Sequence, residues 1–575
     1  MVKNEQIILT ILAALVGLLG GGAAIVFREG IALVQSLAFG FDSEYVFSLA
    51  SKLPWWHILL ATTGGGLIVG LLIRFAMPGQ RVHAVADVIE ASTLRDGEMS
   101  LRNGLVSALI SAISLGAGAS TGREGPVVHL GATLSVFVAD KLRLGRPLAR
   151  TLLGCGVAAA VAASFNAPIA GVFFALEVVI GHYALKAFAP IVIASVTGTI
   201  VSRIYFGDFP AFLIREYEVV SFLEFPAFAM LGLISAMMAI IFMQSVAFTQ
   251  NTIKKTNIPV WLRPACGGFL VGVIALAFPH VLGVGYEATN AAMQERMELW
   301  LLVSLLVAKT AATAVSLAFG FGGGVFSPSL YLGAMLGGAF GLIATQLFPE
   351  LSSGNGAYTI VGMGAVAGAV LGAPISTILM IFELTNNYAI TIAVMIATVI
   401  ASVVTRHVFK HSYFTWQLAT RGLDVKGGRE QSLLRAITIA TVMKSEYETV
   451  DPDASLDTVR HRLQESHYGE IFVVDHFGML HGTITLADLG DAAFDTTDDA
   501  GRSAEDVARH NPPVLTPDDT LDQALKLMDS VHEEHIAVVA DRYVTRVVGF
   551  VHQLDVMSAY NNAVLQARAE EQGEV

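Results

Sequence analysis

Gly122-Arg123-Glu124-Gly125-Pro126 and Gly324-Val325-Phe326-Ser327-Pro328 each begin with glycine and end with proline, and they are the strongest indication of the fold of this chain. Each is followed, five residues after its proline, by a glycine–alanine pair, Gly131-Ala132 in the first case and Gly333-Ala334 in the second. The second stretch therefore repeats the first at an offset of 202 residues (324 − 122). Proline suits the first turn of a helix, and glycine lets the chain approach a ligand closely. The pattern predicts matched helix starts in two halves of one domain.

The duplication extends to a second pair of segments. Ala167-Pro168-Ile169 is followed nine residues after its proline by Glu177, and Ala373-Pro374-Ile375 is followed at the same distance by Glu383, an offset of 206 residues (383 − 177). Both carboxylates lie in apolar runs, where exposure to lipid would be costly. We expect them to accept hydrogen bonds from helix ends or other backbone N–H groups.

Two helix N-termini aimed at one central point would suit an anion. Helix N-termini present unpaired N–H groups and the positive end of the helix dipole, so they hold an anion without a full cationic charge. The alternative is that these glycines and prolines only let helices pack or kink. The repeat itself is compatible with both interpretations.

Glu124 places a carboxylate at one of these helix starts. A charged side chain at the centre of a membrane helix costs on the order of 2.5 to 3.5 kcal/mol, so Glu124 should face protein or a pore. An ionised carboxylate would occupy the spot that attracts an anion, and protonation would release it. Glu124 is thus a candidate pH-dependent gate; the alternative is a capping carboxylate that never moves.

The composition divides the chain into an apolar body and an acidic tail. Of 575 residues, 54% are hydrophobic and 14% charged, which excludes a soluble enzyme of average composition. Residues 421–575 carry 13 Lys+Arg and 28 Asp+Glu, a net charge of −15 (13 − 28). Residues 1–420 carry 22 and 20, a net charge of +2 (22 − 20), so the tail accounts for the acidity of the whole chain, whose net charge is −13. This acidity argues against nucleic-acid binding.

The body reads as a polytopic helical membrane domain. Its apolar runs are irregular in length and broken by glycine clusters, as expected for helices that end inside the membrane around a polar cavity. The first run, residues 6–27, has no cleavage signature and is interpreted as a retained helix. Basic residues after the last run and Lys3 near the first indicate cytoplasmic N- and C-termini, and we expect a bacterial inner (plasma) membrane.

In this order, the motifs resemble those of the CLC family of chloride channels and proton-coupled anion exchangers. Residues 122–126 match its GREGP motif, residues 324–328 its GxFxP motif, and Phe165 to Glu177 the segment after the first motif. The resemblance implies a homodimer in which each subunit has its own chloride pathway between two inverted-topology halves. It also implies a gating role for Glu124 and an anion site that includes Gly122, Arg123, Gly125 and the backbone amides of Val325 and Phe326.

Three departures from the family pattern bear on mechanism. The family's GSGIP motif is absent, and ungapped counting puts His83 opposite its serine; His83 either donates to the anion or faces water in a rebuilt loop. The family's central tyrosine falls at Phe414, unless a shift of one residue brings Tyr413 into place. The inner proton glutamate is replaced by Val178, which favours a channel over an exchanger, although a water chain would also carry protons.

The tail resembles a tandem CBS pair. Val450-Asp451-Pro452 and Leu515-Thr516-Pro517 open two similar segments, and the apolar run that begins at Ile471 recurs at the same spacing at Ile536. The resemblance implies an adenine nucleotide (ATP, ADP or AMP) on Thr485, Asp488 and Asp555. In the alternative, the module binds no ligand and only strengthens dimerisation, with Thr485 capping the helix after it.

The expected organisation is therefore an all-α membrane domain with two inverted repeats at residues 1–420, followed by an α/β module. A linker at 421–436, CBS repeats at 437–497 and 498–562, and a short tail at 563–575 complete the chain. We expect chloride passage through the lipid bilayer, not enzymatic activity, with no required cofactor and no metal site. The alternative from another class is a membrane-bound nucleotide sensor whose body no longer transports.

Overall fold

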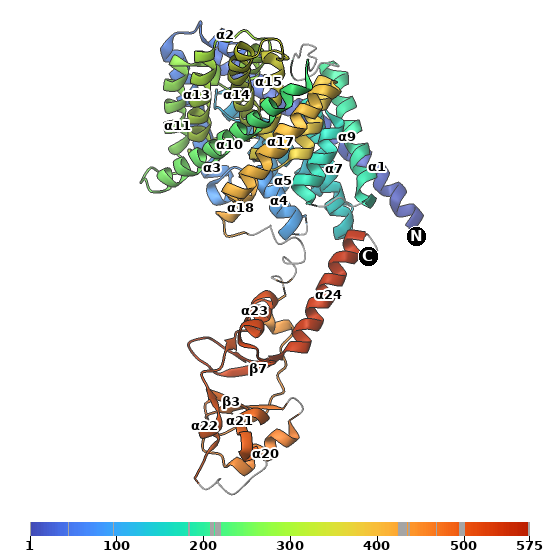
Figure 1. The fold of residues 1–575 in the computed structure, drawn as a ribbon, viewed down its shortest axis with the longest axis vertical. Helices are drawn as coiled ribbons and strands as arrows, with labels where there is room; N and C mark the ends of the chain where they lie inside the picture. The colour runs from blue at the N-terminus through green and yellow to red at the C-terminus, as the bar shows by residue number, and fades with distance from the viewer. Residues whose placement is uncertain are drawn as a thin grey trace. The chain divides into compact units, whose positions relative to one another are not determined.

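A computed structural model describes residues 2–43, 45–95, 97–181, 185–207, 212, 220–423, 434, 437–466, 469–493 and 501–572. The chain divides into two compact units, Met1–Lys426 and Gly427–Val575 (Figure 1). Most of the expected linker at 421–436 lies outside the described residues, as do residues 494–500, which include the expected boundary between the two CBS repeats.

The first unit is helical, and its helices form two series of the same order. The first series consists of α1 (Val2–Phe39), α3 (Trp55–Ala76), α4 (Val85–Leu94), α5 (Leu101–Gly116), α6 (Glu124–Lys141), α7 (Arg146–Phe165), α8 (Pro168–Phe174) with the π-helical η2 (Ala175–Ile180), and α9 (Leu185–Phe206). The second consists of α10 (Phe225–Lys254), α11 (Arg263–Ala277), α12 (Tyr286–Met293), α13 (Leu299–Ala318), α14 (Phe326–Leu347), α15 (Asn355–Leu371), α16 (Pro374–Thr385) and α17 (Tyr388–Phe409).

Short elements connect and end these series. They are α2 (Val46–Ala50), η1 (Pro78–Gln80), η3 (Phe222–Glu224), η4 (Pro279–Val281) and α18 (Tyr413–Ala419). Among the described residues, eight helices are long and apolar enough to cross a membrane, and further apolar helices of 10–17 residues are too short to do so unaided. The predicted polytopic helical fold is confirmed, and short apolar helices lie among the long ones.

Local sequence explains why the two series break at matched places. The helix α7 ends at Asn166 in the left-handed conformation (φ 59°), and α15 ends at Gly372 in the same conformation (φ 68°). Pro168 and Pro374 then start α8 and α16 at the position where a missing N–H costs nothing. Each half thus turns sharply between two helices at equivalent points.

Small residues let the central helices approach closely. In one half, α6 packs on α7; in the other, α14 packs on α15, and these two lie side by side in Figure 1. A Cβ on Gly333 would collide with the Gly362 carbonyl oxygen, and one on Gly131 would lie 2.5 Å from the carbonyl oxygen of Gly156. Glycine is therefore required at both crossings, as in other membrane helix pairs.

The second unit contains two small sheets that follow the predicted repeat. The first sheet has the order β1-β2-β3-β4 and the second β5-β6-β7. The parallel pair β1/β2 aligns Thr449 with Phe472, and the parallel pair β5/β6 aligns Val514 with Ala537. The second pair therefore repeats the first with the same separation in sequence between the aligned residues. The strands are β1 (Thr449–Val450), β2 (Glu470–Val474), β3 (Leu480–Thr485), β4 (Arg509–His510), β5 (Val514–Leu515), β6 (His535–Val539) and β7 (Val547–His552).

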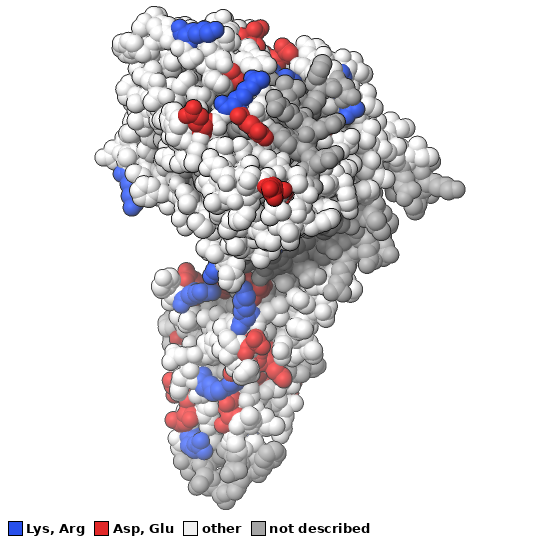
Figure 2. Space-filling model, turned by 45° about the horizontal axis from the view of Figure 1, so that its top comes forward, with Lys and Arg blue, Asp and Glu red and all other residues white. Residues whose placement is uncertain are grey.

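Helices cover these sheets and extend to the end of the described chain. They are η5 (Ile439–Thr441), α20 (Leu456–Glu465), α21 (Leu486–Leu489), η6 (Gly490–Ala493), α22 (Ala504–Val507), α23 (Leu521–Val531) and α24 (Gln553–Gln572). The second unit carries interspersed acidic and basic side chains on the face seen in Figure 2, whereas the first unit is largely uncharged there. The predicted apolar body and charged α/β tail are confirmed.

Candidate functional site

The two motif loops meet through a pair of hydrogen bonds. The Gly122 N–H donates to the Gly324 carbonyl and the Gly324 N–H donates to the Gly122 carbonyl, both at 2.7 Å. A Cβ on Gly125 would lie 3.1 Å from the Gly324 Cα, so the loops need glycine to come this close. Because α6 and α14 begin directly after these loops, their N-termini lie together as the sequence predicts.

A cavity of about 370 Å³ lies at this junction, and we call it the Phe414 cavity. Several helices begin at its wall, among them α4 with Ala84 and Val85, α6 with Glu124 and Gly125, and α14 with Val325 and Phe326. The last two were predicted from the sequence, whereas α4 was not. Because each helix start carries a partial positive charge, the wall is suited to an anion.

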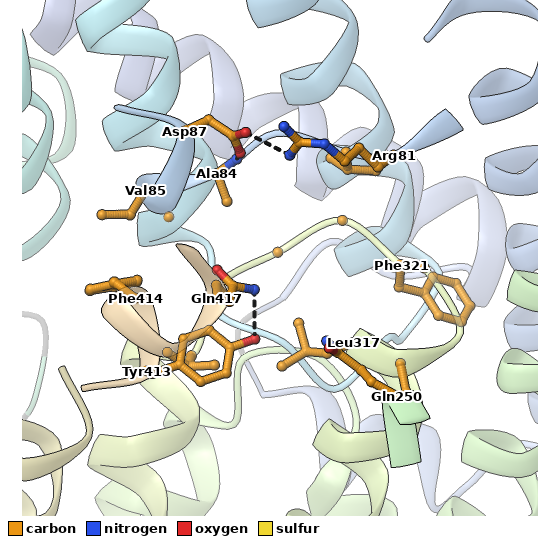
Figure 3. Close-up of a pocket in the computed structure, with 18 of the residues that line it drawn as sticks. Arg81, Ala84, Val85, Asp87, Gln250, Leu317, Phe321, Tyr413, Phe414 and Gln417 are labelled. Atoms are coloured by element: carbon orange, nitrogen blue, oxygen red, sulfur yellow. Dashed lines mark hydrogen bonds and ion pairs between the residues drawn. The ribbon is translucent and has the colours of Figure 1, made fainter. Parts of the chain in front are cut away.

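Side-chain charge around the Phe414 cavity is also predominantly positive. Among the described residues, the cavity has two carboxylates, Asp87 and Glu124. Asp87 pairs with Arg81 at 2.6 Å (Figure 3) and also with Arg421 at 3.0 Å. Lys254 and Arg263 line the same cavity. Four cations against two carboxylates give a field that attracts small anions.

Tyr413 and Phe414 both reach this cavity from the start of α18 (Figure 3). Both are buried, and the Tyr413 hydroxyl accepts a hydrogen bond from the Gln417 side-chain amide at 3.1 Å. The structure thus places an aromatic ring without a hydroxyl next to one that has a hydroxyl. Either Phe414 or Tyr413 could therefore occupy the place of the family's central tyrosine, because both side chains line the cavity.

Glu124 is 1% exposed and lies at the edge of the Phe414 cavity. Its Oε1 accepts from the Tyr286 hydroxyl at 2.9 Å and from the Ser327 hydroxyl at 2.5 Å, and the Arg123 Nε lies 4.0 Å away. Its Oε2 is buried without a hydrogen-bond partner among the described residues. A carboxylate held through one oxygen, with the other unbonded, is less firmly fixed than a fully satisfied cap.

A second cavity of about 330 Å³, the Arg28 cavity, lies against Tyr286, the residue that donates a hydrogen bond to Glu124. Tyr286 and Arg123 line it, together with the turn Gly283-Val284-Gly285, and in the described part of the chain it shares no lining residue with the Phe414 cavity. Glu124 lines one cavity and its hydrogen-bond donor Tyr286 lines the other. The Glu124–Tyr286 contact therefore separates two cavities.

His83 does not line the Phe414 cavity. It lines a third cavity of about 100 Å³, where its ring meets that of His129 edge-on at 5.6 Å between centroids. The reason is local: α4 begins at Val85, so Ala84 and Val85 face the Phe414 cavity while the His83 side chain lies among polar residues beside α4. The prediction that His83 stands in for the missing serine disagrees with this placement.

The tail residues predicted to hold a nucleotide are engaged locally. The Asp488 carboxylate accepts from the Thr485 N–H at 2.8 Å and from its hydroxyl at 2.7 Å, and lies 3.1 Å from the Arg509 Nε. Burial alone would lower the Arg509 pKa, but the Asp488 and Glu533 carboxylates raise it above its ordinary value. Asp555 pairs with Lys444 at 2.8 Å.

A cavity of about 720 Å³ in the tail is lined by other residues. Three aromatic rings, Tyr447, Phe472 and Phe550, form part of its wall, and Lys444 is its one Lys or Arg among the described residues. Neither Thr485 nor Asp488 lines this cavity. Thr485 and Asp488 instead form a capping box at the start of α21, as the alternative interpretation of Thr485 holds.

Tyr286 was not predicted from the sequence, and Ser327 was given no role although it lies inside a quoted motif. Tyr286 starts α12 as Val85 starts α4, and the spacing between these two starts is close to that between the two motif loops. Extending the repeat outward from the motifs would therefore have located it.

The fold and the site define a polytopic membrane protein with two matched halves, helix N-termini at a central cavity and an α/β tail. A family model described as voltage gated chloride channel matches residues 65–406, and a CBS domain model matches residues 439–494 and 504–562. The chain belongs to the voltage-gated chloride channel family and carries tandem CBS domains.

Individual proteins agree with this assignment. A ClcB-like chloride channel protein of Ralstonia nicotianae is 36% identical over 66% of this chain and 90% of its own length. A solved slow cyanobacterial Cl⁻/H⁺ antiporter is similar in fold, with a TM-score of 0.65 and 21% identity over 72% of this chain and 97% of its own. A solved eukaryotic CLC transporter is also similar in fold, with a TM-score of 0.63 and 18% identity; the match covers 95% of this chain and 97% of the transporter chain.

Proposed function

We propose that this protein conducts chloride through the Phe414 and Arg28 cavities and that Glu124 is the gate between them. The observation that carries the proposal is the position of Glu124: buried, at the start of α6, on the boundary between two cavities. The positive helix ends and the surplus of cations in the Phe414 cavity favour an anion as the permeant species.

Protonation is the step that opens this gate. The ionised carboxylate competes with a permeant anion for the positive helix ends of α6 and α14. A neutral Glu124 no longer competes, and its hydrogen bonds from Tyr286 and Ser327 weaken because they lose their charged acceptor. Anion flux should therefore rise as pH falls.

We propose channel-like conduction without proton coupling. Val178 stands on η2 where an inner proton-carrying glutamate would be needed, and it is a partly buried apolar residue that cannot carry a proton. The competing function is proton-coupled exchange, favoured by the fold similarity to a Cl⁻/H⁺ antiporter. Chloride flux measured together with proton movement in liposomes separates the two.

We further propose a homodimer in a bacterial inner membrane with both termini cytoplasmic. The Phe414 cavity then faces the cytoplasm, because Thr420 and Arg421, the residues that lead to the tail, line it. Cross-linking of single-cysteine variants in sealed vesicles tests both orientation and assembly.

For the tail, we propose an adenine nucleotide in the 720 Å³ cavity. The aromatic faces of Tyr447, Phe472 and Phe550 supply stacking surfaces for a base, and these rings carry the proposal. Lys444, which pairs with Asp555, is the one Lys or Arg of the described wall, beside Glu446, Glu448 and Glu470. Titration of the purified protein with ATP and AMP tests this assignment. Nucleotide binding by a protein that carries no anion flux would instead favour the sensor function.

A further inference from the structure

Lys309 is a fully buried lysine inside a membrane-spanning helix. It lies on α13, within the span Leu299–Ala318, and is 0% exposed. Its Nζ donates to the carbonyl oxygens of Val281 at 3.1 Å, Gly283 at 2.9 Å and Val284 at 3.4 Å. All three acceptors lie on one short segment of backbone. A buried ionisable side chain in a membrane span with such a defined set of partners is expected to serve function.

The segment that Lys309 binds is a tight turn. Gly283 and Gly285 both have positive φ, at 60° and 94°. A Cβ on Gly285 would lie 2.7 Å from the Tyr331 Cδ2 and 3.3 Å from the Lys309 Nζ. The Lys309 Nζ also lies 5.0 Å from the centre of the Tyr331 ring, within the range of a cation–π contact. The turn is therefore clamped between α13 and α14.

The clamped turn leads directly into Tyr286, the first residue of α12. The Tyr286 hydroxyl donates to the Glu124 Oε1, and the Arg123 guanidinium lies 4.6 Å from the centre of the Tyr286 ring. A shift of the turn would move this hydroxyl relative to Glu124. The contacts form a continuous series from the Lys309 side-chain amino group, through the turn, to the gating carboxylate.

We propose that Lys309 is a positioning residue of the gate: its side-chain amino group fixes the turn at residues 281–285 and so keeps the Tyr286 hydroxyl on the Glu124 carboxylate. The inference rests on the proposed gating function of Glu124 and deepens it. Lys309 itself touches neither cavity and acts only through Tyr286.

The sign of the effect follows from the hydrogen bond. Donation by Tyr286 favours the ionised carboxylate, so loss of this donor lets Glu124 take up a proton at higher pH. Without Lys309, the flux–pH curve should move to more alkaline pH by about one unit, as expected for one hydrogen bond to a charged group. The other charged groups around Glu124 are unchanged by such a substitution; they are Arg123, Arg81, Asp87, Lys254, Arg263 and Arg421 on one side and Arg28, Glu29 and Asp42 on the other.

A double-mutant cycle on chloride flux tests the proposal. Flux from liposomes is recorded against pH for the full-length protein and for Lys309→Met, Tyr286→Phe and the double variant. We expect each single variant to shift the midpoint to alkaline pH and the double variant to shift it no further than Tyr286→Phe alone. Additive shifts, or an unchanged midpoint in Lys309→Met, would overturn the proposal.

Two further variants keep the test decisive. If Lys309→Met does not fold, Gly285→Ala disturbs the same turn from its other side and should give the same alkaline shift; an unshifted Gly285→Ala would count against the proposal. Lys141→Met, on an exposed lysine in the last turn of α6, is the matched control and should keep the wild-type midpoint.

The gate itself is checked separately with Glu124→Gln. Wild-type pH dependence in Glu124→Gln alone would show that the proposed function is wrong. In the Glu124→Gln background, Lys309→Met should cause no further change in flux. A shift there would show that Lys309 acts by another route and would overturn the positioning role.

Discussion

Glu177 and Glu383 cap helices in opposite halves of the membrane unit. Glu177, on η2, caps α16, and Glu383, on α16, caps α8, which η2 continues. The Glu177 carboxylate accepts from the N–H groups of Ile375 at 3.0 Å and Ser376 at 2.8 Å, in the first turn of α16. The Glu383 carboxylate, on α16, accepts from Ile169 at 2.9 Å and Ala170 at 2.7 Å, in the first turn of α8. This exchange confirms the predicted structural role and ties the two halves together at their equivalent points.

Neutralising either cap should destabilise the membrane unit. In Glu177→Gln or Glu383→Gln, the helix N-terminus loses a charged acceptor, which should cost about 1 to 3 kcal/mol. A lower unfolding temperature in detergent, measured by fluorescence, is the expected result. Glu350→Gln, on an exposed turn, is the matched control and should leave the unfolding temperature unchanged. Equal stability of all three variants would contradict the capping role.

Glu124→Gln should abolish the pH dependence of chloride flux. The amide is neutral at all pH values, so the side chain no longer competes with the anion for the helix ends, and flux should stay high across the range. Liposome flux against pH measures this. Ser327→Ala, which removes one donor to the carboxylate, should retain pH dependence with an alkaline shift, because the donor favours the ionised form. Persistent wild-type pH dependence in Glu124→Gln would exclude the gate.

Arg421→Gln should reduce chloride flux most strongly at low ionic strength. The substitution removes one of the four cations of the Phe414 cavity, and salt screens such steering. The matched control is Arg95→Gln, because Arg95 pairs with Glu90 as Arg421 does but does not line that cavity. A reduction that does not depend on salt, or one equally large for Arg95→Gln, would point to lost stability rather than lost steering.

Phe414→Tyr should strengthen chloride binding. A hydroxyl added to a ring at the cavity wall supplies a donor, and a hydrogen bond to a charged partner is worth about 1.5 to 3 kcal/mol, or about tenfold in affinity at the lower end. The half-saturating chloride concentration of flux should fall accordingly. If it stays constant, the hydroxyl does not reach the anion, and Tyr413→Phe becomes the informative variant.

Tyr447→Ala should weaken ATP or AMP binding by the tail, whereas Asp488→Asn should not. Tyr447 lines the 720 Å³ cavity, but Asp488 bonds to Thr485 and lies beside Arg509. Isothermal titration with each nucleotide measures both variants. The reverse result, loss of binding only in Asp488→Asn, would return the site to the residues predicted from the sequence.

Local signals in the sequence were sufficient to predict the two repeats. Glycine and proline mark turns through their own backbone preferences, so the loops at Gly122 and Gly324 and the helix starts at Pro168 and Pro374 were predictable. The constant spacing between the two tail segments likewise predicted a repeat, which the structure shows as two matching pairs of parallel strands.

Tertiary placement of side chains was less accessible. Counting without gaps put His83 at the anion site, but the start of α4 at Val85 turns its side chain toward another cavity. Lys309 and Tyr286 meet the gate only through contacts between helices far apart in sequence. No short-range pattern encodes such contacts, although the repeat spacing could have drawn attention to Tyr286.

Chloride efflux from liposomes, recorded with proton movement under a chloride gradient and no proton gradient, distinguishes channel-like conduction from exchange. We expect chloride to leave without driving protons uphill, efflux to rise as pH falls, and Glu124→Gln to remove this pH dependence. Protons moved uphill in fixed proportion to chloride would rule out channel-like conduction, because the protein would then be an exchanger with a proton route around Val178.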